Sequence, residues 1–266
     1  MLRISELYIY PIKSLAGISL KQARVERRGL QYDRRWMLVD PAGRFLTQRE
    51  HPQMALLQVS VTEKGLLVYR KTDPDQQMLI PFEQTEGTPR EVVIWEDTCQ
   101  ALPVSVMADR WFTQQLQMDC SLVYMPEDSL RKVDPRYAAH EEIAAFSDAY
   151  PMLLIGQASL DDLNSRLQQP VGWDRFRPNI VFTGGRPYEE DDNFSFQING
   201  ISFRAVKPCA RCVMTTVNQQ TGEKGKEPLR TLAAYRTVEK KVLFGQNLLH
   251  DGPGHLQVGD VLNRHW

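Results

Sequence analysis

The sequence predicts a mainly β protein of the α+β class, built from two parts. Short apolar or alternating runs separated by turn residues dominate the first half of the chain. A second β-rich segment occupies the last third, and two stretches in between have the spacing of amphipathic helices. A chain of 266 residues is long enough for one large domain or two modest ones.

The first half contains eight runs that we predict to be strands. Turn-forming segments such as 41–43 and 63–65 separate these runs, and the alternation over 57–61 suits a sheet with one buried face. This spacing is typical of a β-barrel or a sandwich. The predicted strands cover residues 4–12, 17–26, 34–40, 44–48, 55–62, 65–70, 78–82 and 90–95.

Two helices are predicted in the middle of the chain. The first covers 107–118, where apolar residues form one stripe. The second covers 158–168, with Ser159 as the N-cap, acidic residues in its first turn and leucines at helical spacing. The stretch between the two helices is charged and rich in loop formers, so we place the domain boundary there, between 1–125 and 126–266.

The second domain returns to strand patterns, which we predict for 177–184, 194–208, 244–250 and 255–262. Residues 213–217 are also rich in β-branched side chains and suit a strand. The acidic run 189–192 is expected to be a solvated loop, or else a docking patch for an electron donor.

The charge balance argues against nucleic acid or membrane as a partner. Thirty-two basic residues face thirty-three acidic ones, for a net charge of −1. The N-terminus lacks the apolar stretch of roughly 7–15 residues that a secretory signal needs, and charges interrupt every other apolar run. We therefore expect a cytoplasmic protein.

Two of the four cysteines, Cys209 and Cys212, have the spacing C-x-x-C. A structural zinc site would need a second ligand pair, and the five histidines show no paired spacing. A thioredoxin-like dithiol would precede a helix, whereas β-branched residues follow this pair. The pair alone leaves a metal ligand and two ordinary thiols as equal alternatives. We expect Cys99 and Cys120 to be buried small hydrophobic residues.

Several motifs around these cysteines resemble those of one family. The segment VKPCARCVMTTVNQQTG, followed by EPLRTLAAYR and FGQNL, is similar to the signature of the MOSC family, named for the C-terminal domain of molybdenum cofactor sulfurase. YPIKSLAG, AFSDAYP and FRPNIV stand in the family's order. The branch most similar to the chain is that of the mitochondrial amidoxime-reducing component. The resemblance implies an N-terminal β-barrel-like domain packed on a MOSC β-barrel with peripheral helices, with the cofactor between them.

The resemblance also implies the residues of a molybdenum cofactor site. Cys212 would ligate the metal, for which a thiolate is a suitable soft donor, and Cys209 would not. The phosphate or pyrophosphate of the cofactor needs cations and N–H donors. The implied cofactor-binding residues are Lys13, Ser14, Arg34, Arg177, Asn179 and Arg211.

Other residues near these motifs are weaker candidates. Asp148 is a catalytic candidate, for proton delivery or for orienting a basic neighbour. Arg49 either faces substrate or phosphate or is an exposed charge at a strand end. Thr215 and Thr216 place hydroxyls near the metal or are simply strand formers.

The resemblance implies a molybdenum-dependent reductase of N-hydroxylated compounds, namely amidoximes, hydroxylamines and N-hydroxylated bases. The cysteine spacing of a plant-type [2Fe–2S] domain is absent. Electrons would therefore come from a separate ferredoxin, flavodoxin, cytochrome b5-like protein or flavin reductase, or from a domain missing in this chain. The alternatives are a cofactor carrier or sulfur-transfer module without turnover, and a β-rich binding protein without molybdenum.

Overall fold

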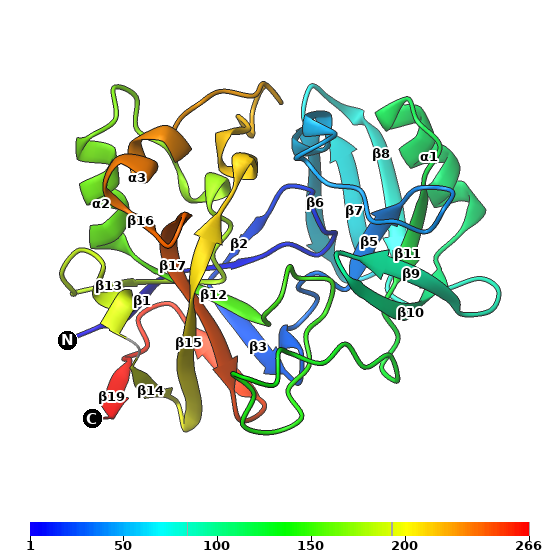
Figure 1. Cartoon of the computed structure of the whole chain (residues 1–266). Coiled ribbons are helices and arrows are strands. Elements are labelled where there is room, and N and C mark those ends of the chain that lie inside the picture. The colour runs from blue at the N-terminus through cyan, green and yellow to red at the C-terminus, as the bar shows by residue number, and fades with distance from the viewer. Residues whose placement is uncertain (84, 193, 266) are drawn as a thin grey trace.

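The computed structural model describes residues 1–83, 85–192 and 194–265. Strands predominate over three α-helices in this part of the chain, which confirms the predicted mainly β, α+β class. Figure 1 shows the strands gathered in two lobes. The large-sheet lobe consists of β1–β4, β12–β19, α2 and α3, and the small-sheet lobe consists of β5–β11 and α1.

A nine-stranded sheet forms the large-sheet lobe, in the order β19-β14-β15-β17-β12-β13-β1-β2, with β16 paired to β17. A second sheet, β18-β3-β4, packs with it around a core rich in phenylalanine. The strand bounds are β1 Arg3–Ile9, β2 Ile18–Leu20, β3 Gln22–Glu26, β4 Gly29–Leu30, β12 Met152–Gly156, β13 Ile180–Thr183, β14 Ser195–Ile198, β15 Ile201–Arg211, β16 Thr237–Val238, β17 Lys241–His250, β18 Gly254–Gln257 and β19 Asn263–His265.

The small-sheet lobe contains two smaller antiparallel sheets, β5-β11-β10-β9 and β6-β7-β8. Their apolar faces and α1 enclose a core centred on Trp36 and Phe112. The strand bounds are β5 Trp36–Val39, β6 Leu57–Thr62, β7 Gly65–Arg70, β8 Asp73–Pro81, β9 Arg90–Ile94, β10 Asp97–Pro103 and β11 Ser121–Tyr124.

The helices differ in part from the prediction. α1 (Val106–Leu116) lies where expected, with Ser105 as its N-cap, and α3 (Leu229–Tyr235) was not predicted as a helix. α2 (Gln157–Ser165) begins two residues before the predicted cap, so Ser159 lies inside the helix. None of the helices in the described residues is long and apolar enough to cross a membrane.

Four strand predictions differ from the structure for local reasons. A turn at Asn199 and Gly200 divides the run 194–208 into the paired strands β14 and β15. Residues 213–216 form a 3-10 helix, because the chain turns immediately after β15 and the threonine hydroxyls bond to backbone carbonyls instead of a neighbouring strand. Residues 44–48 make only isolated bridges. The run 17–26 is divided between β2 and β3, which belong to different sheets.

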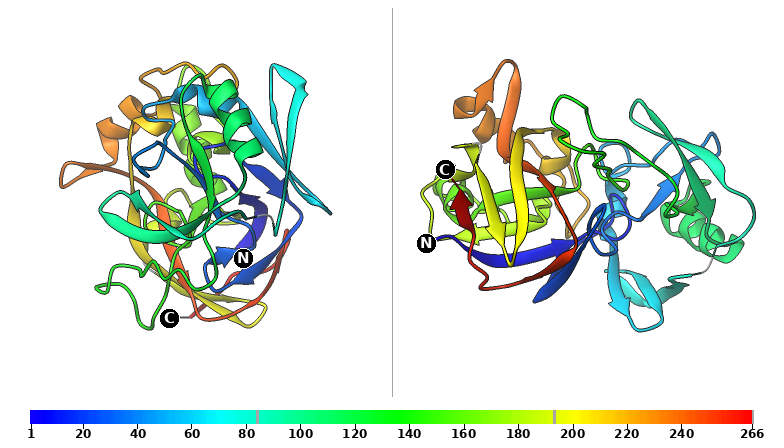
Figure 2. Two further views of the ribbon diagram at one scale, coloured as in Figure 1. Left: turned by 90° about the vertical axis from the view of Figure 1, so that its right-hand side faces the viewer. Right: turned by 90° about the horizontal axis from the view of Figure 1, so that it is seen from below.

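The first strand of the chain belongs to the large-sheet lobe. β1 pairs with β13 and β2, so the N-terminus contributes to the same sheet as residues 152–265. Figure 2 (right) shows β1, in blue, running along this lobe towards the other one. The chain then crosses near Lys13, which donates its backbone N–H to Trp36. This crossing brings residues from the first 50 positions beside β15.

Candidate functional site

Cys212 follows the last residue of β15, at the junction between the lobes. β15 pairs with β17 with two irregularities, between Ala205 and Lys207 and between Pro208 and Ala210. Such bulges bend a strand and often redirect side chains next to functional sites. Cys212 has extended backbone angles and is half-buried, and the 3-10 helix η4 (Val213–Thr216) begins directly after it.

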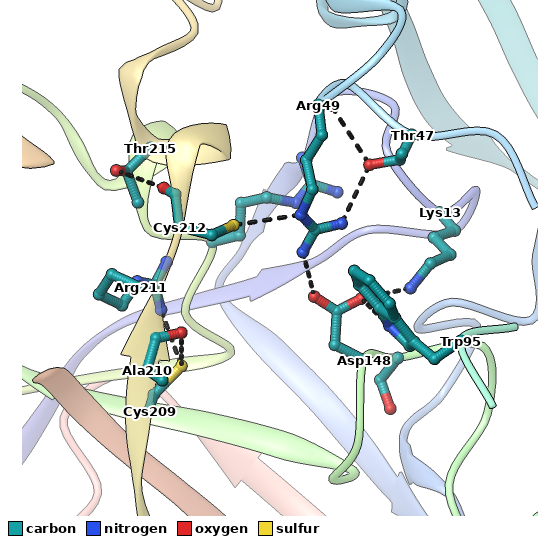
Figure 3. A network of polar contacts seen from close by, with 12 residues as sticks. Lys13, Thr47, Arg49, Trp95, Asp148, Cys209, Ala210, Arg211, Cys212 and Thr215 are labelled. Atoms are coloured by element: carbon teal, nitrogen blue, oxygen red, sulfur yellow. Dashed lines mark hydrogen bonds and ion pairs between the residues drawn. The ribbon is translucent and has the colours of Figure 1, made fainter. Parts of the chain in front are cut away.

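Arg49 reaches the Cys212 sulfur from the small-sheet lobe. Its Nε donates to Cys212 Sγ over 3.1 Å, and its Nη1 donates to Thr47 Oγ1 over 3.0 Å. Its Nη2 donates to Asp148 Oδ2 over 2.9 Å, so one guanidinium joins a thiol and a carboxylate (Figure 3). The side chain is 17% exposed. Burial opposes its charge, but Asp148 and the sulfur raise the pKa of Arg49 above its ordinary value.

Lys13 and Asp148 form the second ion pair of the site. Lys13 Nζ lies 2.5 Å from Asp148 Oδ1 and also donates to the backbone carbonyl of Phe146 over 2.8 Å. Burial lowers the pKa of Lys13 to about 8, although Asp148 acts in the opposite direction. Removal from water opposes ionisation of Asp148, yet Lys13 and Arg49 together hold its pKa well below the ordinary range. Asp148 is therefore ionised at neutral pH, which favours orienting a basic neighbour over delivering a proton.

Two arginines contact the buried ring of Tyr10. The guanidinium carbons of Arg34 and Arg177 lie 4.3 and 4.1 Å from its centroid. Arg34, Arg177 and Ser14 have φ values of 48°, 58° and 67°, in the left-handed region that non-glycine residues rarely adopt. Such strain persists where the surrounding structure imposes it, often at ligand sites. Burial first, and then Arg34, lower the pKa of Arg177 to about 10.

Asn179 lies in the wall of the site, but its amide is used within the protein. Its Oδ1 accepts from Arg34 Nη1 over 3.0 Å and from the backbone N–H of Leu153 over 3.2 Å. Its Nδ2 donates to the backbone carbonyl of Tyr8 over 3.1 Å. Both oxygen lone pairs are thus engaged. The structure consequently favours a role for Asn179 in holding Arg34, over the direct contact with pterin and phosphate that the sequence suggested.

Four buried polar atoms around the site have no hydrogen-bond partner among the described residues: Arg175 Nη1, Arg211 Nε, Ser147 Oγ and Tyr150 Oη. Arg211 otherwise donates to Cys209 Sγ over 3.0 Å and to the carbonyl of Phe176 over 2.7 Å. Buried donors without partners are costly, so each needs a ligand or an ordered water. The sequence prediction omitted Arg175, which directly precedes the motif FRPNIV, and Ser147 and Tyr150, which lie inside the motif AFSDAYP.

All eight residues predicted from the sequence line one cavity, and the four residues with unpartnered atoms line it too. Six cationic side chains and a single carboxylate, Asp148, face this space. Its volume of about 120 Å³ suits the phosphate end of a cofactor and not the whole of one. A thiol, excess positive charge and unpartnered donors together fit an anionic cofactor whose metal accepts a soft ligand. The cationic residues are Lys13, Arg34, Arg49, Arg175, Arg177 and Arg211.

The other three cysteines pack against apolar parts of the protein. Cys209 packs against the core that contains Leu153 and Phe176, as expected for a structural position. Cys99 and Cys120 are buried as predicted, and burial raises the pKa of each thiol to about 11. Among the described residues, no group of three or more His, Cys, Asp or Glu side chains could hold a metal.

The acidic run 189–192 is not the free, solvated loop that we expected. Glu190 is fully buried and accepts a hydrogen bond from Ser159 Oγ over 2.8 Å. Burial raises the pKa of its carboxyl to about 7. The other three residues form ion pairs, Glu189 with Arg264, Asp191 with Arg236 and Asp192 with Arg186. The charges of these three residues are thus paired within the protein.

Comparison with known proteins identifies two matching domains. Residues 1–119 match the MOSC N-terminal beta barrel domain, and residues 141–263 match the MOSC domain. The mitochondrial amidoxime-reducing component 1 of Mus musculus is 33% identical over 97% of this chain and 80% of its own length. The mitochondrial amidoxime reducing component 2 of Bos taurus is 32% identical over 97% of this chain and 81% of its own length. The molybdenum cofactor sulfurase of Oryza sativa subsp. japonica is 31% identical over 92% of this chain but only 32% of its own length.

Proposed function

Because the chain belongs to the MOSC family, we propose that it is a molybdenum-cofactor-dependent reductase of N-hydroxylated compounds. The substrate class comprises amidoximes, hydroxylamines and N-hydroxylated bases. One observation carries the proposal. The Cys212 thiol lies in the wall of a cavity that is also lined by six cationic side chains and one carboxylate. The relatives named as amidoxime-reducing components support the reaction class.

The residues of the cavity divide the work of holding the cofactor. Cys212 would anchor the metal, and the Lys13 ammonium together with the Arg34, Arg175, Arg177 and Arg211 guanidinium groups would hold the anionic end of the cofactor. When bound, the molybdenum centre supplies the two electrons that cleave the N–O bond. We propose that these electrons come from a separate ferredoxin, flavodoxin, cytochrome b5-like protein or flavin reductase.

The reaction also consumes two protons, because the N–OH group becomes N–H and the oxygen leaves as water. The pKa of the buried Lys13 is about 8, close to neutral pH. Its ammonium group is therefore our candidate for the proton donor of the site. Asp148 keeps Lys13 charged and fixes the Arg49 side chain through its second oxygen. In this scheme Asp148 orients the two cations and does not itself deliver the proton.

The second candidate function is a cofactor carrier or sulfur-transfer module without turnover. The similarity to a molybdenum cofactor sulfurase over 92% of the chain favours this candidate. A carrier should release the cofactor readily to an acceptor, whereas an enzyme should retain it through purification and many turnovers. The two functions therefore differ in a measurable property.

The decisive experiment uses protein produced in a host that makes the cofactor. Molybdenum and pterin are quantified first, and benzamidoxime and hydroxylaminopurine are then offered with dithionite-reduced viologen as electron source. The proposal expects close to one metal per chain and reduction of at least one substrate, with neither in Cys212→Ala. Metal that is present but passes readily to an acceptor protein, without reduction of either substrate, would favour the carrier. Absence of molybdenum would exclude both candidates and leave the β-rich binding protein.

A further inference from the structure

An open basin adjoins the cavity on the side of the small-sheet lobe. Its volume is about 1020 Å³, ample for a small-molecule ligand, and it shares Arg49, Asp148 and Ala149 with the cavity. The turn between β9 and β10 and the segments 44–51 and 131–135 form its walls. A molecule in this basin would reach Cys212 past Arg49 and Asp148.

Trp95 forms an aromatic wall of the basin, at the turn between β9 and β10. Its ring lies 5.0 Å from that of Phe45, at 56°, and 4.5 Å from the Arg49 guanidinium carbon. Its Nε1–H donates to Asp148 Oδ1 over 3.3 Å (Figure 3). Despite these contacts the residue is 44% exposed, so part of a fixed aromatic surface faces the basin. Fixed, partly exposed indole rings are effective stacking partners for flat ligands.

The charge of the basin is opposite to that of the cavity. Six carboxylates and four cationic side chains line it, together with His51. Glu96 and Asp97 stand directly after Trp95, and Asp97 pairs with Arg131 at 2.7 Å. An excess of carboxylates disfavours an anionic ligand and favours a neutral or cationic one. The face of the Trp95 indole ring also attracts cations, through a cation–π interaction.

We propose, on the premise of the proposed function, that this basin binds the substrate and that Trp95 selects flat aromatic N-hydroxylated compounds that are neutral or cationic. The product of an aromatic amidoxime is an amidine, which is flat and cationic at neutral pH, so the same surface suits both substrate and product. Trp95 acts through stacking, and its N–H bond to Asp148 keeps the ring in place. Small or anionic substrates gain nothing from this surface.

The test compares an aromatic and a small substrate in holo-protein. Trp95→Ala should raise the KM for benzamidoxime by at least roughly fivefold, as loss of one stacking contact would. The KM for hydroxylamine should rise much less, so that the ratio of the two KM values increases, since hydroxylamine makes no stacking contact. Trp95→Phe, which keeps a ring but removes the N–H, should retain most of the preference for benzamidoxime. Wild-type protein should also bind a 4-carboxylate derivative of benzamidoxime more weakly than benzamidoxime itself.

A second readout does not depend on turnover. Benzamidine, which has no N–O bond, is titrated into holo-protein while the tryptophan fluorescence is followed. The wild type should show saturable quenching that Trp95→Phe lacks, and calorimetry should show weaker binding to Trp95→Ala. Equal changes in KM for both substrates in Trp95→Ala, or benzamidine binding unaffected by that change, would overturn the substrate site. Trp95-dependent benzamidine binding without reduction of any N–OH compound would instead reject the proposed function and retain the site.

Discussion

Arg49 Nε lies 3.1 Å from Cys212 Sγ. An arginine of the small-sheet lobe therefore contacts the cysteine that directly follows β15 of the large-sheet lobe. The same guanidinium bonds to Asp148, whose other oxygen holds Lys13. A thiol, two cations and a carboxylate thus form one connected network where the lobes meet.

The two cysteines of the C-x-x-C pair should differ in metal retention. Cys212→Ala should reduce bound molybdenum to background, because no other described cysteine lies beside Arg49 in the cation-lined cavity. Cys209→Ala should retain most of the metal, since Cys209 packs against the core. Elemental analysis of the two purified variants, with Cys99→Ala as a buried control, makes the comparison. Metal lost from Cys209→Ala and kept by Cys212→Ala would show that the wrong sulfur was chosen.

Asp148→Asn should shift the pH dependence of cofactor retention. Burial lowers the pKa of Lys13 to about 8, and Asp148 limits that fall. Without the carboxylate, the pKa of Lys13 drops further, so the ammonium loses its charge at a lower pH. Retention should therefore decline as pH rises through about 8 in the wild type and at lower pH in the variant. Pterin content after dialysis between pH 6 and 10 measures this.

The exposed Asp128→Asn is the matched control for that experiment and should follow the wild type, because Asp128 does not line the cavity. Identical retention curves for Asp148→Asn and the wild type would contradict the role assigned to the carboxylate.

Asn179→Ala should destabilise the fold and weaken the hold on Arg34. The change removes the oxygen that accepts hydrogen bonds from Arg34 and from the buried backbone N–H of Leu153. It also removes the amide group that donates to the backbone carbonyl of Tyr8. Leaving such groups unsatisfied costs about 1–3 kcal/mol in free energy of unfolding. Urea titration measures it, with Gln114→Ala on the exposed face of α1 as a control expected to change little. A loss no larger than that of the control would argue against this bonding scheme.

Glu190→Gln should alter the pH dependence of stability. Burial raises the pKa of Glu190 from its ordinary 4.5 to about 7, so folding disfavours the ionised form. Its stabilising contribution is complete below pH 4.5 and is lost as pH rises to about 7. The free energy of unfolding of the variant, relative to the wild type, should increase across this window by roughly 3 kcal/mol and then level off. A difference that stays constant from pH 4.5 to 8 would refute the assignment.

Local patterns in the sequence were sufficient for much of the fold. Alternation predicted the strands β1 and β6, because side chains on a strand point to opposite faces in turn. The same reasoning missed β12, whose five residues are all buried and show no alternation. It also predicted a strand over 213–217. The chain turns there into a 3-10 helix, because the preference of β-branched residues for strands is weaker than the constraint of the turn.

By itself, the sequence determined the mainly β class and the family, and it named eight residues that line one cavity. Only the tertiary structure decided how these residues meet. Arg49 and Cys212 are 163 positions apart, and no local periodicity specifies that a loop of one lobe reaches a strand end of the other. Trp95 and the unpartnered Arg175 Nη1 came to light for the same reason, because burial, partners and neighbouring charges are properties of the packed chain.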